Sequence, residues 1–104
     1  MDEVFKALAD RNRRKMLDMV RDNPGMNVNE LAEHFEFSRY AVMKHLKILE
    51  AAKLLLPKRE WKEKKLYLNA IPIREIHDRW ISKYSGEWAS RLTKLKNDLE
   101  KEKE

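Results

Sequence analysis

The sequence predicts a mostly α-helical fold with one small β-hairpin, in a single domain that spans residues 1–104. Three observations lead to this prediction. Apolar residues recur at steps of three and four along most of the chain, which is the spacing of amphipathic helices. Only two residues are glycine and 39% are charged, as is typical of helix-rich globular proteins. One stretch, LLLPKREWKEKKLYLN at residues 54–69, instead reads as two short strands joined by a charged turn.

The composition excludes several classes of protein. The chain has no cysteine, which rules out disulfides, thiolate metal sites and cysteine nucleophiles. No apolar run approaches the roughly 20 residues that cross a bilayer, and the start MDEVFKALAD lacks the pattern of a signal peptide. We therefore expect a cytoplasmic protein that does not bind membranes.

Two helices are expected before the first loop. Asp2 to Ala9 carries Val4, Phe5, Leu8 and Ala9 at helical spacing. Asp10 is a suitable N-cap for a second helix, whose buried stripe consists of Met16, Leu17, Met19 and Val20. Asn23-Pro24-Gly25 then ends this helix.

The segment from 28 to 52 predicts a helix-turn-helix. Asn27 or Asn29 starts a third helix that runs to Phe35, and Ser38 caps a fourth helix that runs to about Ala52. Two helices joined by such a tight turn are the unit with which many proteins enter the major groove of DNA. The outward side of the fourth helix is expected to carry Arg39, Tyr40, Met43, Lys44 and Lys47.

The hairpin at 54–69 is expected to form a wing beside this unit. Its strands are predicted at Leu54–Arg59 and Lys64–Asn69, with a charged turn at Trp61–Glu63. Pro57 restricts the first strand to an edge or a bulge, because proline has no amide hydrogen to donate.

A long amphipathic helix is predicted at 72–100. Pro72 suits its first turn, and the apolar side chains follow at steps of three and four: Ile73, Ile76, Trp80, Ile81, Tyr84, Trp88, Leu92, Leu95 and Leu99. Gly86 lies within it and indicates a kink or a close helix contact. A helix of this length outruns its domain, so a second chain is expected to cover its far half. The predicted dimer interface consists of Val4, Phe5, Leu8, Trp80, Tyr84, Trp88, Leu92 and Leu95. A purely intrachain core and a ligand pocket among the aromatic residues are the alternatives.

The positive charge is concentrated in the middle of the chain. Ser38 to Tyr67 holds nine Lys or Arg and three Glu, whereas the whole chain has a net charge of only +5. This segment is the candidate surface for a polyanion. The predicted DNA-contacting residues are Ser38, Arg39, Tyr40, Met43, Lys44, Lys47, Lys58, Arg59, Lys62, Lys64 and Lys65. Other interpretations are an ordinary solvated helix face, packing of Tyr40 or Met43 on a neighbour, and wing charges that only prevent aggregation.

Several segments resemble the ArsR/SmtB family of winged helix-turn-helix repressors. They are VFKALAD, RRKMLDMV, NELAEHFEFSRYAVMKHLKILEAAKLL, KREWKEKKLYLN and the closing helix with Trp80, Tyr84 and Trp88. The resemblance implies that the fourth helix enters the major groove, that the hairpin lies beside the duplex, and that the first and last helices form a dimer. The chain departs from the family where glycine is usual, with Glu36 in the turn, Lys53 before the wing and no glycine at the wing tip. A non-glycine residue is strained if positive φ is kept there.

The same resemblance raises the question of metal sensing. Metal-sensing members use cysteine pairs or spaced Asp and His residues on the last helix, whereas here His77 and Asp78 are adjacent and no second His follows. The chain therefore resembles the metal-independent members, and we expect no cofactor. No catalytic constellation surrounds His34, His45 or His77, so we do not expect an enzyme.

The predicted function is sequence-specific binding of double-stranded DNA as a homodimer at an inverted repeat, with repression of transcription as the result. An unknown protein or small molecule is left open as an effector. The alternative is a protein-interaction module, an antirepressor or adaptor, that holds a partner with its aromatic C-terminal helix. Double-stranded RNA is the less favoured target, because its major groove is too deep and narrow for a helix.

Overall fold

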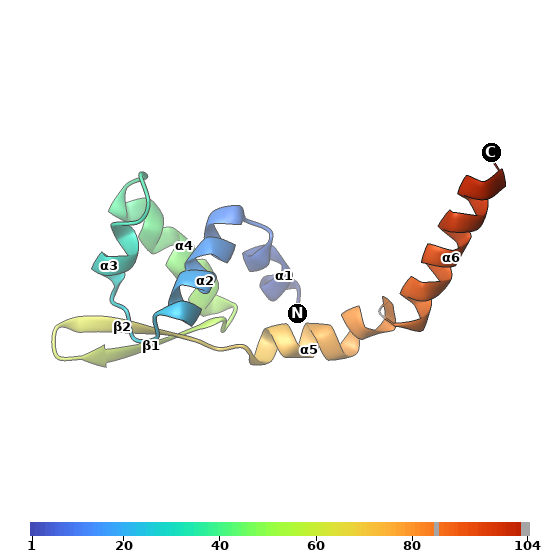
Figure 1. Cartoon of the computed structure of the whole chain (residues 1–104). Coiled ribbons are helices and arrows are strands. Elements are labelled where there is room, and N and C mark those ends of the chain that lie inside the picture. The colour runs from blue at the N-terminus through green and yellow to red at the C-terminus, as the bar shows by residue number, and fades with distance from the viewer. Residues whose placement is uncertain (85, 103–104) are drawn as a thin grey trace. The chain divides into compact units, whose positions relative to one another are not determined.

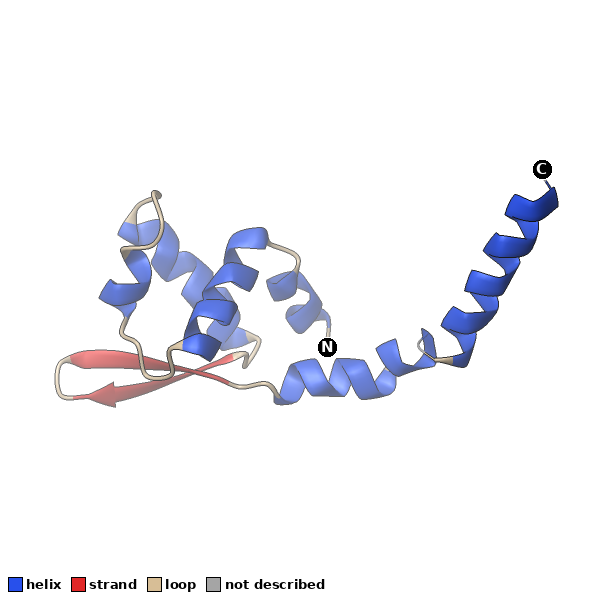
Figure 2. Cartoon of the chain, viewed as in Figure 1, coloured by secondary structure: helices blue, strands red, loops and turns tan. Residues whose placement is uncertain are grey.

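The computed structural model describes residues 1–84 and 86–102 and forms two compact units, Met1–Ile73 and Arg74–Glu104. Their elements in chain order are α1 (Asp2–Leu8), α2 (Arg11–Asp22), α3 (Val28–Ala32), α4 (Arg39–Ala51), β1 (Leu55–Glu60), β2 (Glu63–Leu68), α5 (Ile71–Arg79), the 3₁₀ helix η1 (Ile81–Tyr84) and α6 (Glu87–Glu102). The predicted class, a mostly α winged helix-turn-helix with one hairpin and a long C-terminal helix, is confirmed (Figure 2).

In the first unit, helices α1 to α4 gather on one side of the β-hairpin (Figure 1). The core lies between these helices and the strands. Its largest fully buried side chains are Met16, Leu31, Leu46, Leu49, Leu54, Leu55 and Leu66. Burying each of these side chains contributes about 1.5–3 kcal/mol, so this shared core is a main source of stability.

Three predicted helix starts are capped by side chains. Asp10 accepts a hydrogen bond from the Arg13 amide at 3.0 Å, and Asn27 accepts one from the Glu30 amide at 2.8 Å. Ser38 Oγ accepts one from the Ala41 amide at 3.2 Å, at the start of α4. Each cap satisfies one of the open amides of a first helical turn.

The hairpin is tighter than the sequence predicts. Glu60 pairs with Glu63, so the loop consists of Trp61 and Lys62 alone. Pro57 lies in β1, at an edge of the two-stranded sheet as predicted. The chain before α3 bonds to β2, because the Gly25 amide donates to the Leu66 carbonyl at 2.8 Å and the Leu66 amide donates to the Met26 carbonyl at 2.9 Å. The helix-turn-helix and the wing are thereby joined directly.

Two details of the helix-turn-helix and the wing differ from expectation. Helix α3 ends at Ala32 rather than at Phe35, and a turn leads to Ser38. Strain at Glu36 was expected only if positive φ is kept there, and it is not kept: the non-glycine residues with positive φ in the described ranges are Lys53 (φ 62°) and Trp61 (φ 57°). The left-handed geometry is therefore retained before the wing and at its tip, where a lysine and a tryptophan adopt it.

The prediction of one continuous helix from residue 72 to 100 is wrong. The long C-terminal helix exists as α6, of 16 residues, but α5 ends at Arg79 and η1 separates the two. Gly86 has φ 67°, which a right-handed helix does not contain, and this accounts for the break just before α6. The kink indicated by Gly86 is thus a complete interruption.

Candidate nucleic-acid interface

Helix α4 has one buried and one exposed side. Val42, Leu46 and Leu49 are buried in the core. Ser38, Arg39, Tyr40, Lys44 and Lys47 are exposed, and Met43 is half-buried. The residues predicted to read DNA therefore lie away from the core side, with Met43 at the margin.

Tyr40 does not pack on a neighbouring helix, because its side chain is 71% exposed. Lys44 Nζ lies 5.2 Å from the centre of the Tyr40 ring, one helical turn away. This cation–π contact holds an ammonium group and a phenol side by side on the exposed face of α4. Both groups can donate hydrogen bonds to base edges or phosphates.

A cleft of about 220 Å³ connects α4 to the wing. It is lined by Asn27, Val28, Asn29, Arg39, Met43, Arg59, Lys62, Glu63 and Lys64. Five of the predicted DNA-contacting residues, from two separate elements, thus meet at one site. Asn27 and Asn29 were expected only to start a helix, and no local signal in the sequence places them beside the wing.

The five wing cations are not equivalent. Glu60 holds two of them, with Lys65 Nζ 2.9 Å and Lys58 Nζ 3.4 Å from its carboxylate oxygens. The hydrogen bond from Lys65 is the largest cause that lowers the pKa of Glu60, and the hydrogen bond from Lys58 is the next. The bond between Lys65 and Glu60 also raises the pKa of Lys65.

Lys64 is held by a residue of α4. Its Nζ lies 2.6 Å from Oε1 of Glu50, an ion contact without hydrogen-bond geometry. In the described part of the chain, neither Arg59 nor Lys62 has a carboxylate partner. These two cations are therefore the ones available to an external anion without breaking an existing pair.

Arg13 fixes α4 to the first two helices, a role that the sequence patterns did not reveal. Its Nε donates to the Ala7 carbonyl at 2.9 Å and its Nη2 to the Lys6 carbonyl at 3.0 Å, both at the end of α1. Its Nη1 donates to His45 Nδ1 at 3.2 Å, in the middle of α4. Since a guanidinium can only donate, His45 Nδ1 is the acceptor. The guanidinium thus joins the end of α1 to α4.

The residues predicted for the dimer interface differ in exposure. Val4 is already buried in its own unit at 9% exposure, whereas Phe5 is 39% exposed and Leu8 is half-buried. In the second unit Trp80, Tyr84, Trp88, Leu92 and Leu95 are all close to half exposed. Trp80 and Tyr84 contact each other edge to face, with ring centres 5.8 Å apart.

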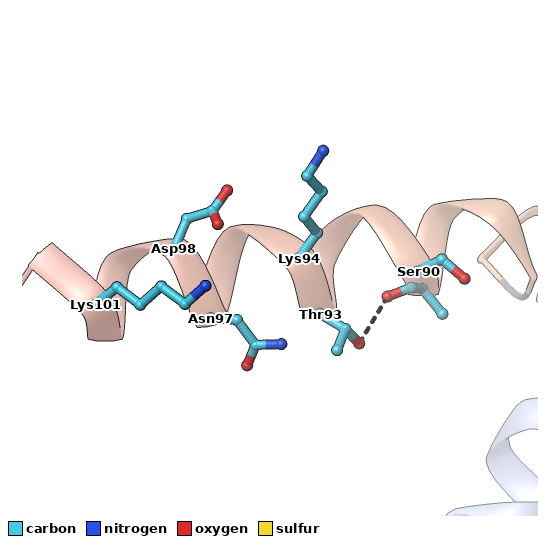
Figure 3. A pocket seen from close by; sticks show the side chains of 7 residues that line it. Ser90, Thr93, Lys94, Asn97, Asp98 and Lys101 are labelled. Carbon is cyan, nitrogen blue, oxygen red and sulfur yellow. Dashed lines mark hydrogen bonds between the residues drawn. The ribbon is translucent and has the colours of Figure 1, made fainter.

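Helix α6 buries none of its described residues. Figure 3 shows one side of it, which is polar and carries Ser90, Thr93, Lys94, Asn97, Asp98 and Lys101. The shallow depression along this side is lined by one helix only, so it is a helix surface and not an enclosed binding site. The apolar residues Trp88, Leu92, Leu95 and Leu99 follow each other at helical spacing elsewhere around the same helix, each about half exposed.

No group of three or more His, Asp or Glu side chains suited to a metal ion occurs in residues 1–84 and 86–102. His77 Nδ1 lies 3.4 Å from Asp78 Oδ1, and both side chains are exposed. The described helices include none with the length and apolar character needed to span a membrane.

Comparison with known proteins gives consistent results. A family model for a helix-turn-helix domain matches residues 8–57. The transcriptional repressor SdpR of Bacillus subtilis (strain 168) is 40% identical over 55 residues, which are 53% of this chain and 60% of SdpR. YuzN, an uncharacterized HTH-type transcriptional regulator of the same organism, is 34% identical over 86 residues, 77% of this chain and 94% of YuzN. The structure of an ArsR-like transcriptional regulator from Rhodococcus sp. RHA1 superposes with a TM-score of 0.73 at 26% identity, covering 96% of this chain and 90% of that one.

Proposed function

Because this chain belongs to the ArsR family of winged helix-turn-helix transcriptional regulators, we propose that it represses transcription as a homodimer bound to an inverted repeat in double-stranded DNA. The observation that supports this most is the cleft in which Arg39 and Met43 of α4 meet Arg59, Lys62 and Lys64 of the wing. A surface built from a helix and a cationic hairpin matches a major groove flanked by phosphates.

In this proposal the two elements have different tasks. Base edges are read by Arg39, Tyr40, Met43, Lys44 and Lys47 of α4, whose side chains have the lengths and donors that base recognition requires. Ser38 and the wing cations Lys58, Arg59, Lys62, Lys64 and Lys65 position the protein on the phosphates. Arg59 and Lys62 carry most of the wing contribution, since the other three must first leave a carboxylate.

The homodimer is supported by the apolar surface of the second unit. A 16-residue helix with no buried residue is only marginally stable alone in water, because helix nucleation is costly. A second copy would cover Trp80, Tyr84, Trp88, Leu92 and Leu95, and Phe5 and Leu8 of α1 are the remaining candidates. Two recognition helices then meet successive major grooves, about 34 Å apart.

The proposal is tested by selection from random duplex DNA, followed by titration of the enriched site at several salt concentrations. An enriched inverted repeat bound by two chains is the expected result. Lys44→Ala should weaken binding to that site by about 1–3 kcal/mol while the dimer persists. Lys94→Ala is the matched control, because it removes the same charge from the polar side of α6 and should leave the affinity unchanged.

Two outcomes would contradict the proposal. Full affinity in Lys44→Ala would remove α4 from the interface. A folded dimer that enriches no duplex would favour the protein-interaction module, and the partner would then be sought at the apolar side of α6.

A further inference from the structure

Trp61, at the tip of the wing, is the most exposed of the large apolar side chains in the described structure. It is 98% exposed. No ring contact or cation contact to another described residue involves its indole. Tryptophan ordinarily gains stability by burying 150–250 Å² of surface, so this position gives up that gain.

The backbone of Trp61 is also costly. Its φ of 57° lies in the left-handed region, where a bulky side chain is rare. Trp61 is the first residue of a two-residue hairpin loop, a place that favours glycine, asparagine or aspartate. The flanking Glu60 and Glu63 pair in the ladder, and Glu60 is held by Lys58 and Lys65. Since these contacts close the hairpin without the indole, the fold has no need for tryptophan here.

Strained residues of this kind occur preferentially where a side chain meets a ligand. The neighbours of Trp61 indicate the chemistry of that ligand. Lys62 follows it directly and Arg59 lies two residues before it. Neither cation has a carboxylate partner among the described residues, and both line the cleft that reaches Arg39 of α4. Glu63 lines the same cleft and repels phosphate, so attraction of an anion at the tip depends on Arg59 and Lys62.

An exposed apolar ring close in sequence to two available cations fits a polyanion that also offers apolar surface. Duplex DNA does so in its minor groove, where phosphates border the sugar walls and apolar side chains are known to lie. A partner protein with an apolar pocket would have no use for the two adjacent cations. We propose that Trp61 is a DNA-contacting residue: its indole lies in the minor groove against the sugar walls, while Arg59 and Lys62 bind the flanking phosphates. This inference rests on the proposed function, with α4 in the adjacent major groove.

The decisive variant is Trp61→Gly, because it removes the ring and also relieves the left-handed backbone. We expect at least a tenfold loss of affinity for the selected duplex, with a thermal midpoint equal to or above that of the wild type. Trp61→Phe keeps an apolar ring and should lose no more than about threefold. Leu56→Ala removes an exposed apolar side chain from β1, away from the loop, and should bind as the wild type does.

A spectroscopic measurement follows the indole directly. A mixed-sequence duplex is added at low salt to the wild type and to Trp61→Phe, and the difference between their fluorescence changes reports on Trp61. We expect the duplex to quench the fluorescence of Trp61 and to protect its indole from quenching by iodide. If the wild type binds duplex and Trp61→Gly binds it with equal affinity, the inference is overturned and the proposed function stays intact. A wild type that binds neither the selected nor the mixed-sequence duplex overturns both.

Discussion

Replacing Arg13 with alanine is expected to destabilise the first unit strongly. The side chain is only 14% exposed, and its guanidinium donates to two carbonyls of α1 and to His45 of α4. The contacts with Ala7 and His45 are partly buried, so their loss leaves acceptors without partners. At about 1.5 kcal/mol for each of these two charge-assisted bonds, with little added by the exposed Lys6 carbonyl, the cost is about 3 kcal/mol.

This loss is large relative to the stability of such a domain, which is about 5–10 kcal/mol. The assay is urea unfolding followed by circular dichroism at one fixed protein concentration, because the stability of the proposed dimer would depend on concentration. With an m-value of about 1.5 kcal/mol per molar, the midpoint should fall by roughly 2 M. Arg13→Lys keeps the charge but lacks the planar fork, and should recover only part of the loss.

Arg14→Ala is the matched control for the same measurement. Arg14 donates through Nη1 to the Leu8 carbonyl at the end of α1 at 2.7 Å, but this bond is exposed and does not reach α4. Its removal should cost less than about 1 kcal/mol. If Arg13→Ala cost no more than Arg14→Ala, the inference that the guanidinium ties α1 to the recognition helix would be refuted.

Four further predictions concern the wing, a helix cap, two glycines and α6. Glu60→Gln should release Lys58 and Lys65, raise duplex affinity and steepen the salt dependence of binding by up to about two phosphate contacts; an unchanged slope would contradict this. The Arg13 amide bonded to Asp10 lowers the pKa of that carboxyl, so its stabilisation is complete at neutral pH and is lost on acidification through the lowered pKa. Asp10→Asn keeps the capping acceptor and should therefore lose less stability than the wild type between about pH 5 and pH 2 in urea melts. Gly25→Ala should cost more than Gly86→Ala in the same melts: both have positive φ, but only at Gly25 would the new Cβ crowd a neighbour, the Tyr67 hydroxyl at 3.1 Å. In sedimentation, Leu95→Glu should yield monomers, whereas Asn97→Glu on the polar side of α6 should remain dimeric.

The sequence by itself was sufficient for features that depend on residues close in the chain. Asp10 and Ser38 were predicted as caps from their residue types at the helix starts. In the structure each accepts a hydrogen bond from the amide three residues onward. The two sides of α4 follow from helical spacing, which places Val42, Leu46 and Leu49 together in the core. Such local rules also predicted the hairpin, and whole segments of the sequence separately resemble the ArsR family.

Features that join distant residues were decided by the tertiary structure. Glu50 and Lys64 meet only because the hairpin packs on α4. With the contacts of Glu60, this leaves Arg59 and Lys62 as the wing cations without a carboxylate partner among the described residues. Arg13 reaches His45 across 32 residues, a separation at which no periodicity carries information. The tightness of the loop likewise depended on the register of the two strands, which sets Trp61 in a left-handed conformation at the tip. Composition and spacing report which side chains are present, whereas ion pairing and backbone strain depend on which neighbours packing brings within a few ångströms.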